Sequence, residues 1–240
     1  KNVKKKKRQF GEEKRRKIME EKTKPQARTR DLGKGSIPKL LAQLAIPVVV
    51  AQIVNLLYNI VDRIYIGHIS GIGAAALTGV GLFAPILMLI NAFAMLSGSG
   101  GAPRAAIFMG KRDNETAEKI MANCFSLILI FAVGLTILFS IFAPRLLILF
   151  GASDATLPYA VEYARIYIFG SIFVLIVLGM NLFITTQGFS KISMMTTLIG
   201  AVINVILDPI FIFVFDMGVR GAAIATVLSQ AVGAIWVLRF

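Results

Sequence analysis

The sequence predicts an all-α integral membrane protein, and three observations support that fold class. Of the 240 residues, 56% are hydrophobic and 16% are charged, whereas a soluble domain averages about half apolar and about a quarter charged. The apolar residues gather in six stretches, each close to the ~20 residues that a helix needs to cross the hydrocarbon core of a bilayer. The charge is segregated as well, since residues 1–39 carry 16 of the 26 Lys and Arg but only 5 of the 13 Asp and Glu. A basic tail therefore precedes a long, nearly neutral apolar body.

Each apolar stretch is predicted to form a transmembrane helix, because lipid offers no hydrogen-bond partner to an open backbone N–H or C=O group. The predicted spans cover residues 40–61, 72–97, 120–143, 166–186, 192–215 and 221–238. Polar or glycine-rich segments connect them, at residues 62–71, 98–119, 144–165, 187–191 and 216–220. The sequence thus divides into a basic tail, residues 1–35, and a six-helix region, residues 36–240.

An even number of spans places both termini on the same side of the membrane. The basic tail indicates that this side is the cytoplasm, because segments rich in Lys and Arg stay inside. We therefore predict a multi-pass protein of the plasma (inner) membrane with cytoplasmic N- and C-termini. The tail has only Phe10 to stack on a nucleic-acid base, so we interpret it as a solvated segment on anionic lipid and expect no nucleic-acid partner.

The scarcity of certain residue types excludes several kinds of site. A single cysteine, Cys124, cannot form an internal disulfide bond or a cysteine-based zinc site, and a single histidine, His68, excludes a multi-histidine metal centre. The sequence contains no Gly-rich phosphate loop, no Gly-x-Ser-x-Gly motif and no His-Glu-x-x-His pair. We therefore expect neither an enzyme nor a bound cofactor, which leaves channels, secondary transporters and structural membrane subunits.

Asp208 is the most informative polar residue, because it lies inside the fifth predicted span. A carboxylate at the centre of a membrane helix costs about 2.5–3.5 kcal/mol on insertion scales, so it normally faces a partner or water. Asn204 precedes it by four residues and therefore shares its helical face. Pro209 follows directly, and we expect it to bend the helix and to move Asp208 out of the helical conformation. The alternative is a simple kink at which Asp208 caps a freed N–H group.

Asp62 ends the first predicted span and leaves two interpretations open. With Tyr58 one turn earlier, it can belong to a buried polar site, whereas beside Arg63 it can equally form an ion pair at the membrane interface. Pro47 lies early in the same span and removes a helical hydrogen bond, so we predict that the helix bends there.

Several of these residues fall within motifs that resemble those of the multidrug and toxic compound extrusion (MATE) transporters. The resemblance covers about residues 36–240, and the motifs occur in the family's order on the corresponding spans. Family members consist of two six-helix lobes, so the resemblance implies that this chain is the N-terminal lobe of a twelve-helix transporter. The matching motifs are Ile46-Pro47, Tyr58-Asn-Ile-Val-Asp62, Gly110-Lys-Arg-Asp113, Asn204-Val-Ile-Leu-Asp208-Pro209 and Met217-Gly-Val-Arg-Gly-Ala-Ala-Ile-Ala-Thr226.

The resemblance also implies a function, the export of organic, often cationic, drugs or toxic compounds in exchange for H⁺ or Na⁺. Pro47 matches the proline at which the family's first helix bends. If the two acids meet in a dry site, one of them would carry the proton. Alternatively, Na⁺ would bind the carboxylate, amide and hydroxyl oxygens, since hard cations prefer oxygen ligands. The implied coupling-ion site consists of Tyr58, Asp62, Asn204, Asp208 and Thr226, with Na⁺ at the last four of these residues.

The resemblance also bears on the partners of this chain, and two other functions stay open. The chain does not contain the family's second lobe, so we expect it to be part of a longer protein whose C-terminal lobe completes the drug cavity. A parallel homodimer is the less simple alternative. One rival function is a lipid-linked oligosaccharide flippase of the same superfamily, although its cavity would need basic side chains for phosphate, which the interiors of these spans lack. The other is a scaffold subunit without transport activity.

Overall fold

The computed structural model describes residues 36–240, and within them the chain is almost entirely helical. The predicted tail, residues 1–35, lies outside the described residues. Six helical segments of the described part are long and apolar enough to cross a membrane, which confirms the predicted all-α class with six spans. The elements are α2 (Ile37–Gly67), α3 (Gly73–Leu82), α4 (Ala84–Gly110), α5 (Asn114–Leu149), α6 (Leu157–Thr186), α7 (Ser190–Pro209), the π-helical segment η1 (Ile210–Val214) and α8 (Gly218–Arg239).

The helices extend further than the apolar stretches that predicted them. Residues 98–119, expected as a connecting segment, are mostly helical, because α4 continues to Gly110 and α5 begins at Asn114. Residues 144–165, also expected as a connection, contain the end of α5 and the beginning of α6. Hydropathy marks only the part of a helix that suits hydrocarbon, whereas the helix itself ends where a cap or turn stops it.

The start of α5 shows how such an end is fixed. The Asp113 carboxylate accepts a hydrogen bond from the Thr116 N–H at 3.1 Å, so Asp113 is the N-cap of α5. The same hydrogen bond favours the charged carboxylate and lowers the pKa of Asp113. The α4–α5 connection is therefore a tight, capped turn rather than a long loop.

The second predicted span is divided into two helices, α3 and α4, which meet at Phe83. Pro85 lies in the first turn of α4, where its missing N–H is tolerated, but it cannot continue the hydrogen bonds of α3. The Phe83 ring is fully buried and packs edge-on against Tyr163 and Tyr167 of α6, with ring-centroid separations of 5.6 and 5.4 Å. These aromatic contacts hold the junction against α6.

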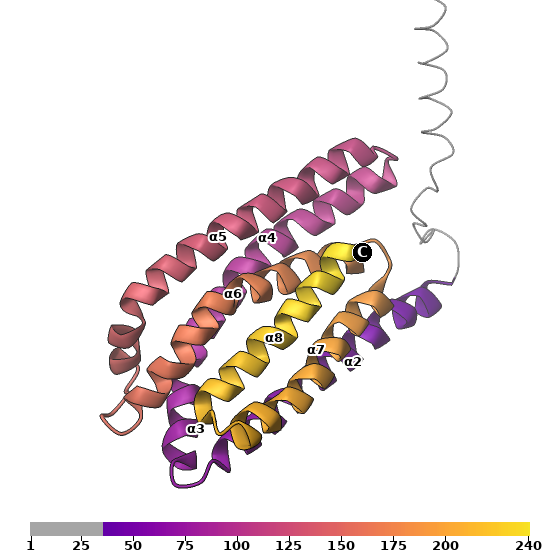
Figure 1. The fold of residues 1–240 in the computed structure, drawn as a ribbon. Coiled ribbons are helices and arrows are strands. Elements are labelled where there is room, and N and C mark those ends of the chain that lie inside the picture. Colours follow the sequence, from indigo (N-terminus) through magenta and orange to yellow (C-terminus); the bar gives the residue numbers. More distant parts are fainter. Residues whose placement is uncertain (1–35) are drawn as a thin grey trace, which may run out of the picture. The chain divides into compact units, whose positions relative to one another are not determined.

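Helix α6 is the central support of the bundle. It packs against α8, α4 and α5, and also contacts α3 and α7. Figure 1 shows it between the α4–α5 hairpin and the remaining helices. Helix α2 is peripheral by contrast, since it packs mainly along α7 and leaves most of its side chains exposed. Helix α6 is thus enclosed on several sides, whereas α2 is held mainly on one side.

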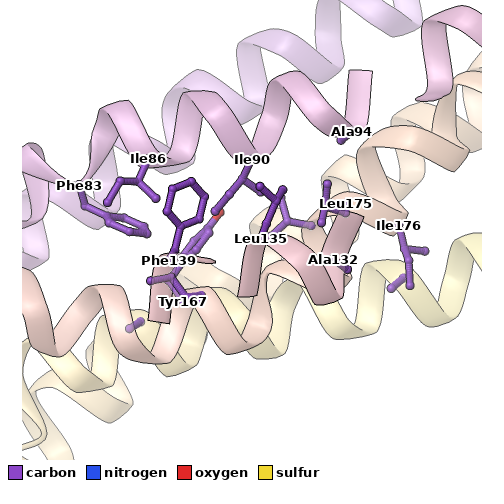
Figure 2. Packing of buried hydrophobic residues seen from close by; sticks show 14 of the residues in the cluster. Phe83, Ile86, Ile90, Ala94, Ala132, Leu135, Phe139, Tyr167, Leu175 and Ile176 are labelled. Atoms are coloured by element: carbon purple, nitrogen blue, oxygen red, sulfur yellow. The ribbon is translucent and has the colours of Figure 1, made fainter. Parts of the chain in front are cut away.

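An apolar core fills the space between α4, α5 and α6, as Figure 2 shows. Lipid tails are as apolar as these side chains, so close packing rather than exclusion from water holds the helices together. The core positions recur at helical spacing on each element, which is what aligns them on one face. Its labelled members are Phe83, Ile86, Ile90, Ala94, Ala132, Leu135, Phe139, Tyr167, Leu175 and Ile176.

Helix α7 ends in an irregular segment that follows Pro209. The expectation that Pro209 moves Asp208 out of the helical conformation is wrong, because Asp208 is helical and the disturbance falls on the following residues. The packing of α7 against α2 and α8 outweighs the local preference of a residue before proline. After Pro209 the chain widens into a π turn, in which the Phe215 N–H donates to the Ile210 carbonyl oxygen at 2.9 Å.

The start of α8 lies directly against this π turn. A Cβ atom on Gly221 would lie 2.7 Å from the Phe211 carbonyl carbon and 2.9 Å from the Ile212 nitrogen, so only glycine fits without a shift of backbone atoms. This contact fixes how closely the C-terminal end of α7 and the N-terminal end of α8 approach. It therefore also sets the position of Thr226, five residues further along α8.

The substitution Gly221→Ala is expected to destabilise the lobe by about 1–3 kcal/mol, because the added methyl group would overlap the backbone of η1. Gly134→Ala is the matched control, since a Cβ on Gly134 of α5 would meet no atom within 4 Å. Alanine should stabilise the helix there by up to about 1 kcal/mol. Thermal unfolding in detergent micelles measures both changes, and equal midpoints for the two variants would contradict the required close approach.

Candidate functional site

A buried polar site lies where α7 and α8 meet. Asn204 and Asp208 lie one turn apart on α7, with side chains 1% and 0% exposed. The Asn204 amide Nδ2 donates to the Asp208 carboxylate Oδ1 at 3.1 Å. The same nitrogen donates to the hydroxyl oxygen of Thr226, on α8, at 3.4 Å. The helical spacing of the first pair and the close approach of α8 thus bring three polar side chains together.

Thr226 contributes an oxygen acceptor to this site. Its hydroxyl hydrogen is already used, because Oγ1 donates to the Ala222 carbonyl oxygen at 3.0 Å. The remaining lone pairs of Oγ1 are therefore free to accept, as they do from Asn204. The Thr226 hydroxyl can therefore accept a hydrogen bond or coordinate a cation, but it has no hydrogen left to donate to the site.

Asp62 reaches the same site from α2, 146 residues earlier in the chain than Asp208. Its carboxyl group lies close to the Asp208 carboxyl group. Arg63 is exposed and forms no ion pair within residues 36–240. Of the two sequence interpretations, the structure therefore places Asp62 in the buried polar site rather than in an interfacial ion pair.

Three oxygen atoms of the site have no hydrogen-bond partner among the described residues. They are Oδ1 of Asp62, Oδ2 of Asp208 and Oδ1 of Asn204, and all three are buried. Buried polar atoms are normally paired, and an unpaired one costs about 1–3 kcal/mol. All three atoms are acceptors, so a positively charged species or a proton donor is what would satisfy them.

Aromatic hydroxyls surround the two acids. Tyr58 of α2 lies close enough to Asp62 and Asp208 to interact with both. Tyr163 and Tyr167 of α6 lie near Asp62 and Tyr58. The sequence analysis did not pair Tyr163 with Tyr167, because residues 144–165 were predicted as a connecting segment and only Tyr167 fell inside a predicted span. Their spacing of four residues, which places both rings on one face of a helix, was the available signal.

The two prolines predicted to bend helices lie at different distances from the site. Pro209 directly follows Asp208, whereas Pro47 precedes Asp62 by 15 residues, about 22 Å along a helix. Helix α2 is continuous through Pro47. Pro47 therefore does not take part in the polar site, and any influence it has on Asp62 passes along α2.

The donor set suits a small monovalent cation. The site combines two carboxyl groups with an amide oxygen and a hydroxyl oxygen, all hard ligands. Within residues 36–240, no three His, Cys, Asp or Glu side chains come together in the manner of a multivalent metal site. A proton or Na⁺ would offset the repulsion between the carboxylates without leaving an excess of positive charge.

Comparisons with known proteins agree on one family. The MatE family model matches residues 47–210. The multidrug export protein MepA of Staphylococcus haemolyticus (strain JCSC1435) is 26% identical over 201 residues, which make up 84% of this chain and 44% of that protein. MepA of Staphylococcus saprophyticus subsp. saprophyticus is 28% identical over 204 residues, 85% of this chain and 45% of that protein. The chain thus spans about half the length of the curated relatives it matches.

Solved structures show the same similarity. A MATE protein in its bent conformation is 33% identical with a TM-score of 0.80, over 88% of this chain and 46% of that one. An outward-facing multidrug resistance MATE transporter of the MOP superfamily is 31% identical with a TM-score of 0.81, over 89% of this chain and 47% of that one. A MOP superfamily transporter from Pyrococcus furiosus has the same identity, TM-score and coverage, and is described as having a binding pocket of reverse polarity that suggests a different function.

The MATE proteins among these relatives are transporters rather than enzymes. The family model covers more than half of the chain, and the six apolar helices correspond to one half of the solved transporters. The chain therefore belongs to the MATE family of multi-pass membrane transporters.

Proposed function

We propose that this chain forms one lobe of a secondary active antiporter that exports organic, often cationic, compounds in exchange for H⁺ or Na⁺. The observation that carries the proposal is the meeting of Asp62 and Asp208 in a buried site with unpaired oxygen atoms. The relatives named multidrug export proteins support the cargo class. The residues proposed to bind the coupling ion are Tyr58, Asp62, Asn204, Asp208 and Thr226.

The electrostatics of the pair explain why it would bind a cation. Two carboxylates in contact repel one another, and the repulsion is strong where the surroundings are apolar. A shared proton removes one charge and joins the two groups by a hydrogen bond, and Na⁺ compensates them by direct coordination. In the Na⁺ form the ligands would be the oxygens of Asp62, Asn204, Asp208 and Thr226. Either ion also satisfies the unpaired acceptors.

The helices that carry the two acids suggest how ion binding is coupled to movement. Asp62 lies on α2, which is held mainly by α7, whereas Asp208 lies on α7 itself, which also packs on α8 and α6. An ion shared by the two carboxyl groups would tie α2 to the rest of the bundle, and its departure would loosen that connection. Coupling then requires only that the ion and the drug favour different positions of α2.

The exposed face of α2 is the proposed wall of the drug cavity. Gln52 and Asn59 are exposed, and the Asn59 amide donates to the Asn55 side-chain oxygen at 2.9 Å. Polar amides at this position on a membrane helix are costly if they face lipid, so a water-filled cavity or a second lobe is the better neighbour. That lobe would be the C-terminal half of a longer protein or, less simply, a second copy in a parallel homodimer.

The rival functions predict different side chains at the site. A flippase for lipid-linked oligosaccharides needs cations that hold phosphate, whereas the polar site of this lobe is built from acids, amides and hydroxyls. A scaffold subunit needs no carboxylate pair, because neutral polar groups connect helices at lower cost. We accordingly favour cation-coupled export, in the plasma (inner) membrane and with both termini in the cytoplasm.

In a transporter that contains this lobe, Asp208→Asn is expected to abolish ion-driven export while leaving membrane insertion intact. The variant keeps the shape of the side chain but removes the charge that the ion must compensate. Asp216→Asn is the matched control, because Asp216 is exposed in the turn after η1 and its positive φ also suits asparagine. Uptake of a fluorescent organic cation into inverted vesicles measures both, and undiminished uptake by Asp208→Asn would refute the proposal.

Pro47→Ala is expected to slow the change between access states more than it weakens drug binding. Alanine restores the hydrogen bond that proline removes, so α2 becomes harder to bend at this point. The measurement compares the equilibrium affinity for a fluorescent cation with the rate of its transport. A fall in affinity as large as the fall in rate would show that Pro47 acts on binding instead.

A further inference from the structure

The buried face of α7 is polar near both of its ends. Five of its six buried residues are polar, whereas the seven buried residues of α5 are all apolar. The polar positions recur every three or four residues near each end of α7, and the buried residue between these two groups is Ala201. From the proposed ion site to the beginning of α7, the polar residues are Asp208, Asn204, Thr196, Ser193 and Ser190.

Helix α8 adds hydroxyl groups beside these polar residues. Ser229 is 2% exposed and lies one turn beyond Thr226, whose carbonyl oxygen it contacts at 2.8 Å. A Cβ on Gly200 of α7 would lie 3.9 Å from the Ser229 carbonyl oxygen. One turn further, a Cβ on Gly233 of α8 would lie 3.8 Å from the Thr196 methyl carbon. The two helices therefore face one another across polar residues and glycines at successive levels.

Helices α6 and α2 contact the Ser190 end of this face. The Asn181 amide Nδ2 of α6 donates to the Ser193 carbonyl oxygen at 3.3 Å, while its Oδ1 is buried without a hydrogen-bond partner among the described residues. The Ser190 hydroxyl donates to the Gln43 carbonyl oxygen of α2 at 3.3 Å. We call the set formed by Thr226, Ser229, Thr196, Ser193, Asn181 and Ser190 the polar seam.

Asn181 and Ser190 connect neighbouring helices, whereas three other hydroxyl groups of the seam hydrogen-bond within their own helices. Thr196 donates to the Ile192 carbonyl oxygen of its own helix, and Ser229 and Thr226 likewise donate within α8. A hydroxyl that bonds within its own helix adds little to helix association. Because the single hydroxyl hydrogen of these three residues is used in this way, their oxygens keep lone pairs that can only accept. The result is a row of acceptors that begins at the carboxyl pair.

We propose that the coupling cation moves between the Asp62–Asp208 site and the Ser190 end of the lobe along this seam, inside the lobe and apart from the drug cavity. The distance from Asn204 to Ser190 is 14 residues, about 21 Å along the helix. The hydroxyl and amide oxygens of α7, together with the hydroxyl oxygens of Thr226 and Ser229 on α8, would replace the hydration of a passing proton or Na⁺. The inference rests on the proposed function, and by the predicted topology the Ser190 end faces the cytoplasm.

Cysteine accessibility tests the route without measuring export. Thr196→Cys and Ser193→Cys, each combined with Cys124→Ser in the full chain, are reconstituted in liposomes and treated with a membrane-impermeant cationic methanethiosulfonate. Ala234→Cys is the matched control, because Ala234 of α8 is 2% exposed, is adjacent to Gly233 and belongs to the apolar core. A cysteine in dry apolar packing is unreactive, so only a hydrated seam permits labelling.

The expected result is labelling of both seam cysteines from the Ser190 side and none of the control. Unlabelled seam cysteines, or labelling of the control at the same rate, would overturn the proposal. The labelling results do not depend on the transport assay of Asp208→Asn. If the seam cysteines are not labelled, the route is refuted but the proposed export is not. If Asp208→Asn exports normally, the proposed ion site itself is refuted.

A second pair of variants tests the route if the cysteine variants do not fold. Thr196→Val removes the acceptor and Thr196→Ser retains it, so loss of one hydrogen-bonded step predicts protonation of the Asp62–Asp208 pair about tenfold slower in the valine variant. Infrared absorption of the carboxylic acid groups after a pH jump on the Ser190 side measures the rate. Equal rates in the two variants would contradict the seam route.

Discussion

The arrangement of the lobe depends on the cost of placing two acidic groups inside a membrane protein. Asp62 and Asp208 come from helices far apart in sequence, and each would be expensive alone in an apolar environment. Their meeting requires that α7 remain helical up to Asp208, that it widen only after Pro209, and that Gly221 let α8 approach closely enough for Thr226 to meet Asn204. The irregular features of the fold therefore lie around the site, whereas the regular packing lies between α4, α5 and α6.

Helix α6 supports the bundle, whereas α2 is the helix that we propose to move. Helix α6 contacts five other helices, and a displacement there would disturb the aromatic cluster of Phe83, Tyr163 and Tyr167. Packed interiors resist small shifts, so α6 and its neighbours form a rigid reference. Helix α2 has few such contacts and carries Asp62. On the proposed function, a lobe in which one acid is fixed and the other belongs to the least enclosed helix would convert ion occupancy into a change in the position of α2.

Much of the fold was predictable from the sequence, because membrane spans are defined by composition. The six helices and the shared face of Asn204 and Asp208 follow from apolar length and from a spacing of four residues. Helix ends were not predictable in the same way, since α4 and α5 continue beyond the apolar stretches until a cap or turn stops them. The helical conformation of Asp208 depends on packing against other helices, which overrides the local effect of Pro209. The position of Asp62 beside Asp208 likewise depends on tertiary contacts, whereas the sequence alone allowed an ion pair with Arg63 equally well.

The polar face of α7 bears on how a transporter can accept many cargoes. A pump that moves ion and cargo through one passage must close that passage tightly around each cargo, or the gradient leaks past it. On the proposed route the ion never enters the chamber that holds the drug, so an imperfect fit around the drug costs no gradient. Loose selectivity toward cargo would then be compatible with efficient energy conversion, and one chamber could serve molecules of unlike size and shape.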